Sequence, residues 1–422
     1  MVKKINDYLY KEKYFPLILF ILLFISLISN NLFDIISGYK TILFSESTLI
    51  TDYFEISNFG ATFFNVFINV LFYYLLIKHL KIEIDGPIYA GLLTILGFSF
   101  FGKNIINGLP ILYGIYLYSK FVKEDFKKFS IIILFSQGLS PLVSGIAFSD
   151  MFLTPYNLIL GIVFGIISGF ILSPLVNHVF VLHKGYNLYN TGLALGFISF
   201  FFYALLKNVF KKDIYINTIY SNDYHIKILI FIILFSLLFL IIGLILSKFK
   251  LNNYYDLLKT SGKMPMDYIR DYNLETVLIN SGILGLFGVF MTLILNFNLN
   301  GPLLGAIITL MAFGSFGKHI INVLPITLGS IIMVKIIDGN DFRMGFKLAI
   351  LFSSTLAPTS GRYGFVFGII VGFTHIILYP LLLNLQMGYN LYLNGFVGGI
   401  VSLILIPIVE IIEKRRKDDY YE

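Results

Sequence analysis

Long apolar runs separated by short polar loops constrain this chain more than any other feature of its sequence. A spanning helix needs about 20 predominantly apolar residues, and the sequence offers about 12 to 14 apolar segments, several of them shorter than that. Hydrophobic residues make up 57% of the chain and charged residues only 13%, whereas a soluble domain is about a quarter charged. We therefore predict an all-α, polytopic transmembrane helical protein in contact with membrane lipid.

The charged residues of the loops predict how the chain enters the membrane. Lysines are frequent in residues 1–14, directly before the apolar run 15–29, and no small-residue cleavage site follows that run. We expect an uncleaved first helix, with the N-terminus and the basic tail at 414–417 in the cytoplasm and the protein in the bacterial inner membrane. Loop lysines and arginines near anionic lipid explain the net charge of +7. No basic stripe with interleaved aromatic residues suggests a nucleic-acid partner.

A ten-residue segment that occurs twice indicates an internal duplication. Gly102–Ile111 (GKNIINGLPI) and Gly317–Ile326 (GKHIINVLPI) match in eight of ten positions and lie 215 positions apart, and Gly-Tyr-Asn-Leu-Tyr recurs at 185–189 and 388–392. The predicted regions are an N-terminal tail, first helix and outer loop at 1–57, repeat 1 at 58–210, a connecting helix and cytoplasmic linker at 211–272, repeat 2 at 273–410 and a cytoplasmic tail at 411–422.

The number of crossings sets the relative orientation of the repeats. If each repeat crosses six times and the apolar run 227–247 crosses once between them, the repeats enter from opposite faces, as in inverted-topology transporters. Lysines cluster at 120–128, whereas the matching loop 337–345 has mixed charge, which agrees with the positive-inside rule. The lysines of 207–212 disagree, and one re-entrant segment per repeat would make the repeats parallel. We favour inverted repeats that contain short broken or re-entrant helices.

The duplicated segment supplies most candidate ligands. Glycine and proline bracket a place where a helix can stop and restart, and helix ends bind ions or dipoles. The predicted break residues are Gly102, Pro110, Gly317 and Pro325. The predicted solute ligands are Lys103, Asn104, Asn107, Lys318, His319 and Asn322. In the alternative interpretation the segment is a tight loop at the membrane surface, with its lysines extending into the headgroups.

Two further pairs of positions complete the predicted site. Asn187 and Asn390 of the Gly-Tyr-Asn-Leu-Tyr motif each supply an amide donor and acceptor, although the motif also suits a helix start with an aromatic anchor at the membrane interface. Pro141 and Pro358 lie within apolar segments, so each is expected to kink or end a helix. The hydroxyl side chains beside them either satisfy the freed carbonyls or bind a neutral solute.

The chemical groups that are missing narrow the function. No Asp or Glu occurs in an apolar segment away from its ends, although ion-coupled carriers commonly use such carboxylates. With no cysteine, no P-loop and no zinc-binding His-Glu-x-x-His, we expect no cofactor, no metal site and no enzyme. The favoured function is a transporter or channel-like permease for a small polar solute, either neutral and amide-like or a small anion. The alternatives are a membrane-embedded enzyme using Ser, Lys and His groups, or a non-transporting scaffold or sensor. A homo-oligomer is compatible with all three.

The paired motifs and the full-length layout resemble an uncharacterised family of bacterial polytopic membrane proteins, known as a domain of unknown function. That resemblance covers nearly the whole chain and implies no activity. A fainter resemblance is to the urea transporters, which have two inverted halves, Asn-Pro-type motifs near segment starts and Gly-aromatic-Asn turns. Asn300-Gly301-Pro302, with its inserted glycine, and Tyr389-Asn390 match those motifs approximately. A shared fold would not fix the substrate.

Overall fold

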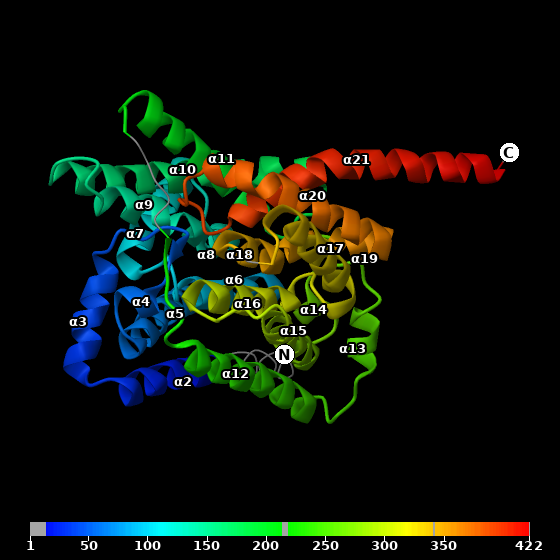
Figure 1. Cartoon of the computed structure of the whole chain (residues 1–422), viewed down its shortest axis with the longest axis horizontal. Coiled ribbons are helices and arrows are strands. Elements are labelled where there is room, and N and C mark those ends of the chain that lie inside the picture. Colours follow the sequence, from blue (N-terminus) through cyan, green and yellow to red (C-terminus); the bar gives the residue numbers. More distant parts are fainter. Residues whose placement is uncertain (1–13, 213–217, 341, 422) are drawn as a thin grey trace.

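The computed structural model describes residues 14–212, 218–340 and 342–421. These residues are mainly helical, with one pair of two-residue strands among them (Figure 1). They include nine helices that are long and apolar enough to cross a membrane, or ten if the bent pair α2–α3 counts as one span. The predicted all-α polytopic fold is confirmed, and the chain is a multi-pass membrane protein.

The first two helices meet at a sharp bend. α2 (Tyr14–Ser29) and α3 (Leu32–Leu43) are bent by 112° relative to one another. Asn31 starts the second helix, because its side-chain oxygen accepts the Asp34 N–H at 2.9 Å and caps the helix. α3 leaves Phe33 exposed, as is typical of an amphipathic helix at a membrane interface. The region predicted as an outer loop therefore contains a helix.

The two repeats contain the same series of eight helices, which confirms the duplication. The helices of repeat 1 are α4 (Tyr53–Ile56), α5 (Phe59–His79), α6 (Gly86–Phe98), α7 (Ile105–Phe121), α8 (Ser130–Phe135), α9 (Ser140–Ala147), α10 (Tyr156–His183) and α11 (Asn190–Asn208). The helices of repeat 2 are α14 (Tyr268–Asp271), α15 (Leu274–Ile294), α16 (Gly301–Ala312), α17 (Ile320–Asp338), α18 (Met344–Phe352), α19 (Ala357–Tyr363), α20 (Phe365–Asn384) and α21 (Leu393–Tyr421). The remaining elements are β1 (Ile50–Thr51), β2 (Thr218–Ile219), α12 (His225–Leu246), α13 (Asn252–Leu257) and the 3-10 turns η1 (Phe126–Phe129), η2 (Ser136–Leu139), η3 (Phe313–Ser315) and η4 (Ser353–Leu356).

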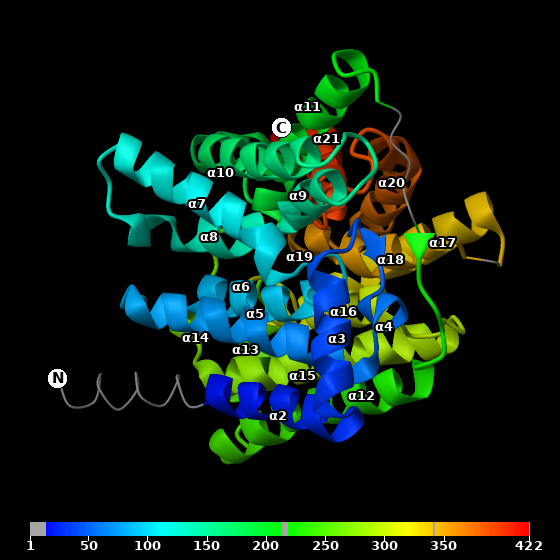
Figure 2. The same ribbon diagram turned by 90° about the vertical axis from the view of Figure 1, so that its left-hand side faces the viewer.

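The equivalent short helices α6 and α16 pack antiparallel in the middle of the molecule (Figures 1 and 2). The hydroxyl of Ser315, just after α16, donates to the carbonyl of Gly86 at the start of α6 at 2.8 Å. At the other end, a Cβ placed on Gly301 would lie 2.6 Å from the carbonyl oxygen of Phe100. Gly86 is equivalent to Gly301 and Phe100 to Ser315, so a two-fold axis perpendicular to these helices relates the repeats. The repeats are inverted, and the parallel alternative is wrong.

The lengths of the central helices also agree with the prediction of short segments. α6 has 13 residues and α16 has 12, which gives each a length of about 20 Å, too short for a hydrocarbon core of about 30 Å. Both are nearly completely buried among longer helices. Protein therefore surrounds the helix ends that a membrane could not satisfy.

The connection between the repeats defines two faces of the molecule. β1 pairs with β2 in parallel, with Ile50 opposite Thr218, and joins the segment before repeat 1 to the segment before α12. α12 then leads to a linker that contains α13, at the opposite end of the molecule from α3 in Figure 1. On that side Arg270 pairs with Asp85 at 2.9 Å. We call these two sides the strand face and the linker face.

The lysines that disagreed with the inverted topology lie on the strand face. α11 ends at Asn208, directly before the segment that leads to β2, and the Lys212 ammonium lies over the ring of Phe152 at 4.9 Å. The linker lies on the opposite side, as an inverted arrangement requires. The lysines of 207–212 are therefore a local exception to the positive-inside rule, and the repeats remain inverted.

Candidate functional site

The two motif lysines lie deep inside the protein. Lys103 follows α6 and Lys318 follows α16, and both side chains are 0% exposed. Gly102 (φ +68°) and Gly317 (φ +99°) make the turns immediately before them, in a conformation that favours glycine. The alternative of a surface loop with lysines in the headgroups is therefore wrong. The chain leaves the helix before each of these glycines and enters the next helix two residues after each lysine.

The prolines of the same motif do not break a helix. α7 begins at Ile105 and α17 at Ile320, so Pro110 and Pro325 lie inside these helices, about one and a half turns from their starts. The prediction that they bracket the break is wrong, because the helix restarts before the proline is reached. The missing proline N–H removes one hydrogen bond near the helix start, and the helix continues beyond it.

The motif asparagines and histidine cap the restarted helices. Asn104 and Asn107 form a reciprocal capping box, in which each side-chain oxygen accepts the backbone N–H of the other residue at 3.0 and 2.9 Å. In repeat 2 the Asn322 side chain accepts the N–H of His319 at 2.9 Å. The His319 imidazole contacts the carbonyl of Thr260 through Nε2 at 2.9 Å, and its buried Nδ1 has no partner among the described residues. The three asparagines thus hold the starts of α7 and α17, and His319 joins the start of α17 to the linker.

Two buried asparagines outside the motif bind each lysine turn to the preceding long helix. The Asn65 amide donates to the carbonyls of Ser99 at 2.7 Å and Lys103 at 3.0 Å. The Asn280 amide donates to Gly314 and Lys318 in the same way, both at 2.7 Å. Sequence reasoning missed this pair. The sequence could have indicated this pair, since the two asparagines occupy apolar segments and share the 215-residue offset of the motif.

The two lysines have different partners. The ammonium of Lys318 donates to the Tyr189 hydroxyl at 2.6 Å and to the Ser354 hydroxyl at 2.8 Å. The ammonium of Lys103 donates to Gln137 Oε1 at 3.0 Å. Neither lysine forms an ion pair within residues 14–212, 218–340 and 342–421. Lys318 thus contacts the other repeat through Tyr189, whereas Lys103 contacts its own repeat.

The second pair of prolines marks a real interruption. Pro141 lies at the start of α9, after the 3-10 turn η2, and Pro358 lies at the start of α19, after η4. The α-helical hydrogen-bond pattern is thus interrupted by a 3-10 turn before each proline, while Phe126–Ala147 still forms one continuous apolar helix of 22 residues. Gln137 of η2 and Ser354 of η4 are the residues that contact the two lysines. Each lysine turn therefore faces the interrupted helix of its own repeat.

Each Gly-Tyr-Asn-Leu-Tyr segment forms a backbone hydrogen bond with the other repeat. Leu188 N–H donates to the carbonyl of Thr355 in repeat 2 at 2.9 Å, and Leu391 N–H donates to the carbonyl of Gly138 in repeat 1 at 2.8 Å. These acceptors lie in the equivalent turns η4 and η2. A backbone N–H of each repeat thus donates to a carbonyl in the 3-10 turn of the other repeat.

The predicted asparagines of these segments cross the same interface. The Asn187 amide donates to the carbonyl of Gly395 at 2.8 Å, and the Asn390 amide to the carbonyl of Gly192 at 3.5 Å. The glycines allow this approach, since a Cβ placed on Gly395 would lie 3.0 Å from the Cα of Gly192. Both predicted ligands are therefore used in joining the repeats at the pseudo-two-fold axis.

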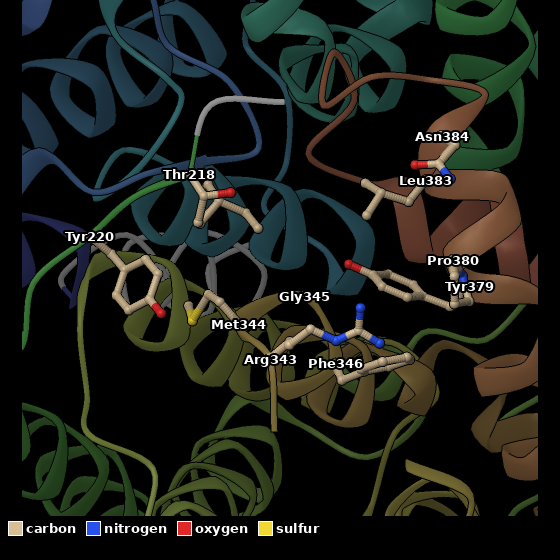
Figure 3. Close-up of a pocket in the computed structure, with 11 residues that line it drawn as sticks. Thr218, Tyr220, Arg343, Met344, Gly345, Phe346, Tyr379, Pro380, Leu383 and Asn384 are labelled. Carbon is tan, nitrogen blue, oxygen red and sulfur yellow. The ribbon is translucent and has the colours of Figure 1, made fainter. Parts of the chain in front are cut away.

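Two cavities open on opposite faces at equivalent places. The linker-side pocket, of about 420 Å³, lies among α8, α10 and α11 and includes Phe129, Val176 and Asn177 in its lining. The strand-side pocket, of about 460 Å³, lies among α18 and α20, with Phe346, Tyr379 and Pro380 at the corresponding positions (Figure 3). The repeats therefore carry one such pocket each, facing opposite sides.

The two pockets differ in depth. The linker-side pocket extends to Tyr189, Gly192 and Tyr392 at the pseudo-two-fold axis, where the two tyrosine rings lie 5.3 Å apart. None of these residues lines the strand-side pocket. There the Tyr379 ring occupies the position of the smaller Val176 and projects into the cavity in Figure 3.

Comparisons with known proteins place the chain in a family without giving it an activity. No curated protein and no solved structure matches it, so the resemblance to urea transporters has no support. The family model described as "Protein of unknown function (DUF1576)" matches residues 32–208 and 246–411. These two stretches contain the two repeats and together cover most of the 422 residues. The chain therefore belongs to the DUF1576 family of proteins of unknown function.

Proposed function

We propose that this protein is a membrane transporter for a small polar solute, which binds where the two inverted repeats meet. The observation that carries the proposal is the pair of equivalent pockets on opposite faces, of which only the linker-side pocket extends to Tyr189 and Tyr392 at the axis. Inverted repeats with a site at their interface are the architecture of many secondary transporters. An exchange of conformation between the repeats would close the linker-side pocket and open its equivalent.

The difference in depth favours a carrier over a permanently open channel. The two pockets share no lining residue, and the packed aromatic rings of Tyr189, Phe313 and Tyr392 lie at the axis. A channel would instead need one continuous polar path from face to face. The solute would therefore reach the axis from one face at a time.

The orientation in the membrane is part of the same proposal. The linker face carries Lys250, Lys259 and Arg270, and the C-terminal helix α21 also contacts it, since Glu410 pairs with Lys184 at 2.6 Å. Positive loop residues favour the cytoplasmic side. The linker face and both chain ends would then be cytoplasmic, in a bacterial inner membrane, and the linker-side pocket would be the inward-facing one.

A membrane-embedded enzyme is the competing class, and one contact bears on it. Lys318 lies 2.8 Å from Ser354, the spacing of a serine–lysine pair. The Ser354 hydroxyl, however, already donates to the carbonyl of Leu351 at 2.7 Å, both side chains are 0% exposed, and neither lines either pocket described above. The equivalent residue in repeat 1 is Gln137, which cannot act as a nucleophile. A transport function involves equivalent residues of both repeats, whereas a serine–lysine enzyme would use residues of repeat 2 alone.

The buried lysines provide the first test of transport. Replacing both with alanine (Lys103→Ala with Lys318→Ala) should abolish solute flux in proteoliposomes, because the turns that position the interrupted helices would lose their side-chain contacts. Osmotic swelling with acetamide, glycerol and sodium methanesulfonate as probes measures the flux. Assembly is checked separately by size-exclusion chromatography.

Two outcomes would count against the proposal at different levels. An assembled double variant with wild-type flux would remove the lysines from the mechanism while leaving transport in place. If the wild-type protein passes none of the probes or of a wider set of polar solutes, the transport proposal itself is wrong.

A further inference from the structure

We infer that the strand-side pocket binds the carboxylate group of a small organic acid between Arg343 and Tyr379. The inference goes beyond the proposed function, because this pocket lies on the face opposite the deeper linker-side pocket and binding in it does not depend on transport. Its grounds are an unpartnered buried hydroxyl in the cavity, an arginine with unused donors at the rim and an apolar wall beside them.

The first ground is the Tyr379 hydroxyl. Tyr379 lies in the C-terminal part of α20, is 2% exposed and lines the strand-side pocket. Figure 3 shows its ring extending from α20 into the cavity, with the hydroxyl at the inner end. The hydroxyl lies beside Gly345, another lining residue, since a Cβ placed on this glycine would be 2.9 Å from the oxygen. The oxygen has no hydrogen-bond partner among the described residues, so a ligand oxygen that accepts its proton would remove the cost of burying it unpaired.

The second ground is Arg343, which precedes α18 and lines the same pocket. Its Nε–H donates to Asp338, and its backbone N–H donates to the same carboxylate at 2.7 Å. Asp338 therefore holds one edge of the guanidinium and leaves the two terminal amino groups without an acceptor among the described residues. The planar guanidinium can bind a second carboxylate through this free end.

The Phe346 ring brings these two groups together. The guanidinium carbon of Arg343 lies 5.0 Å from the centre of the Phe346 ring, and the centre of the Tyr379 ring lies 5.8 Å from it. All three residues line the strand-side pocket. One ligand group can therefore lie between the arginine and the tyrosine.

The other polar groups of the pocket favour a ligand that carries acceptors. No Asp or Glu is among the described residues that line it. At the end of α20, the carbonyls of Leu381 and Leu383 already accept the N–H groups of Leu385 and Gln386. The unused groups named above are donors. A carboxylate offers acceptors on both of its oxygens, whereas an amide offers them on only one side.

Repeat 1 lacks both groups. The turns η2 and η4 begin at Ser136 and Ser353, an offset of 217 positions, so the equivalent of Arg343 is Phe126. The equivalent of Tyr379 is Val176. The carboxylate site is thus a property of repeat 2, and we expect it on the strand face alone.

The walls of the pocket suggest the body of the ligand. Ile50, Phe346 and Leu383 contribute apolar surface, and the cavity of about 460 Å³ lies in the range of small-molecule sites. A small organic acid would place its carboxylate between the arginine and the tyrosine and its apolar body against these side chains.

The test compares two ligands of similar shape that differ mainly in charge. The full-length protein in an uncharged detergent is titrated with benzoate and with benzamide at constant ionic strength, and binding is measured by equilibrium dialysis. We expect saturable binding of benzoate that is about tenfold or more tighter than that of benzamide, as one charge-assisted hydrogen bond would give. Equal binding of the two compounds would overturn the inference.

Variants locate the binding. Tyr379→Phe removes the hydroxyl alone and should weaken benzoate binding several-fold, and Arg343→Gln should weaken it about tenfold or more. Tyr89→Phe removes a buried hydroxyl in α6, and Arg362→Gln removes an exposed arginine that pairs with Glu413 at 3.8 Å. Neither control residue lines either pocket, and both controls should bind benzoate as the wild type does. Losses in the controls equal to those in the two pocket variants would overturn the assignment.

A labelling measurement keeps the test usable if Arg343→Gln fails to fold. The chain has no cysteine, so Asn384→Cys places a single thiol in the lining of the strand-side pocket, and Asn177→Cys places one in the linker-side pocket. Bound benzoate should slow the reaction of Asn384→Cys with a maleimide and leave that of Asn177→Cys unchanged. Protection of Asn177→Cys alone, or of neither thiol at saturating benzoate, would overturn the site.

The outcomes separate this inference from the transport proposal. Benzoate protection of Asn384→Cys without flux of any solute supports the carboxylate site and contradicts transport. Flux of acetamide or glycerol without benzoate binding supports transport and contradicts the carboxylate site.

Discussion

Asp52 should make the stability of the protein fall as the pH rises. This residue precedes α4, outside the membrane-spanning helices, and its side chain is 1% exposed. It accepts the N–H of Phe54 at 2.9 Å and lies against the backbone at Gly301, where α16 begins. Burial raises the pKa of Asp52 from 3.8 to about 7, although the N–H groups of Gly301 and Phe54 partly oppose the shift.

The size of the effect follows from that pKa. One pKa unit corresponds to about 1.4 kcal/mol, so a rise of roughly three units corresponds to about 4 kcal/mol. The folded state holds the Asp52 proton more tightly than the unfolded state. The stabilisation is therefore complete below about pH 4 and is lost as the pH rises through about 7. Between pH 5 and pH 8 the wild-type protein should lose about 3 kcal/mol of unfolding free energy through this group.

The substitution Asp52→Asn tests this reasoning, because asparagine keeps an acceptor for the N–H groups but cannot ionise. Melting in detergent at pH 5 and at pH 8 should show a smaller pH dependence for the variant than for the wild type, with the variant more stable at pH 8. Asp267→Asn is the matched control, since Asp267 occupies the equivalent position, accepts the Gly86 N–H at 2.9 Å and also pairs with Arg270 at 3.2 Å. The control should gain nothing at pH 8. Identical pH dependence in Asp52→Asn and the wild type would refute the argument.

Two further predictions concern the repeat architecture. Asn65→Ala and Asn280→Ala should each destabilise the protein by about 1–3 kcal/mol, because each removes the amide donor of two buried carbonyls. Asn69→Ala is the control, since among the described residues the Asn69 amide donates only within its own helix. A thermal melt in which Asn65→Ala and Asn280→Ala lose no more stability than Asn69→Ala would contradict this. On the cysteine-free chain, Asn177→Cys and Pro380→Cys should react with a membrane-impermeant maleimide from opposite sides of oriented vesicles. Labelling of both from one side would rule out the inverted arrangement of the pockets.

The duplicated architecture could be predicted because the copies retain the same residues at a fixed offset. Lys103 and Lys318 are 215 positions apart, and each lies in the segment between a short helix and a longer one, two residues before the longer helix begins. The same offset relates Asp52 to Asp267, which lie before the predicted start of each repeat. Each of these acids contacts the first glycine of the short helix in the other repeat. The structural equivalence thus extends upstream of the stretches in which the motifs are obvious.

The roles of individual polar residues were harder to predict, because one chemical group serves several purposes. The spacing of Asn104 and Asn107 is that of a capping residue and the third residue of a helix, so the sequence also indicated a structural role beside the predicted ligand role. The contacts between the two repeats could not be predicted from the sequence. No local pattern shows that Leu188 would donate to Thr355, or that Tyr189 would reach Lys318.

The reciprocal contacts at the axis bear on how the protein could change state. Leu188 and Leu391 each donate to the interrupted helix of the other repeat, at 2.9 and 2.8 Å, so exchanging the conformations of the repeats would preserve these main-chain bonds. The two states would then differ in energy mainly where equivalent side chains differ, as at Val176 and Tyr379. A tenfold shift in population needs only about 1.4 kcal/mol, which one large side chain that fits better in one state can supply. The residues that break the symmetry, rather than the duplicated motifs, would therefore decide which pocket reaches the axis.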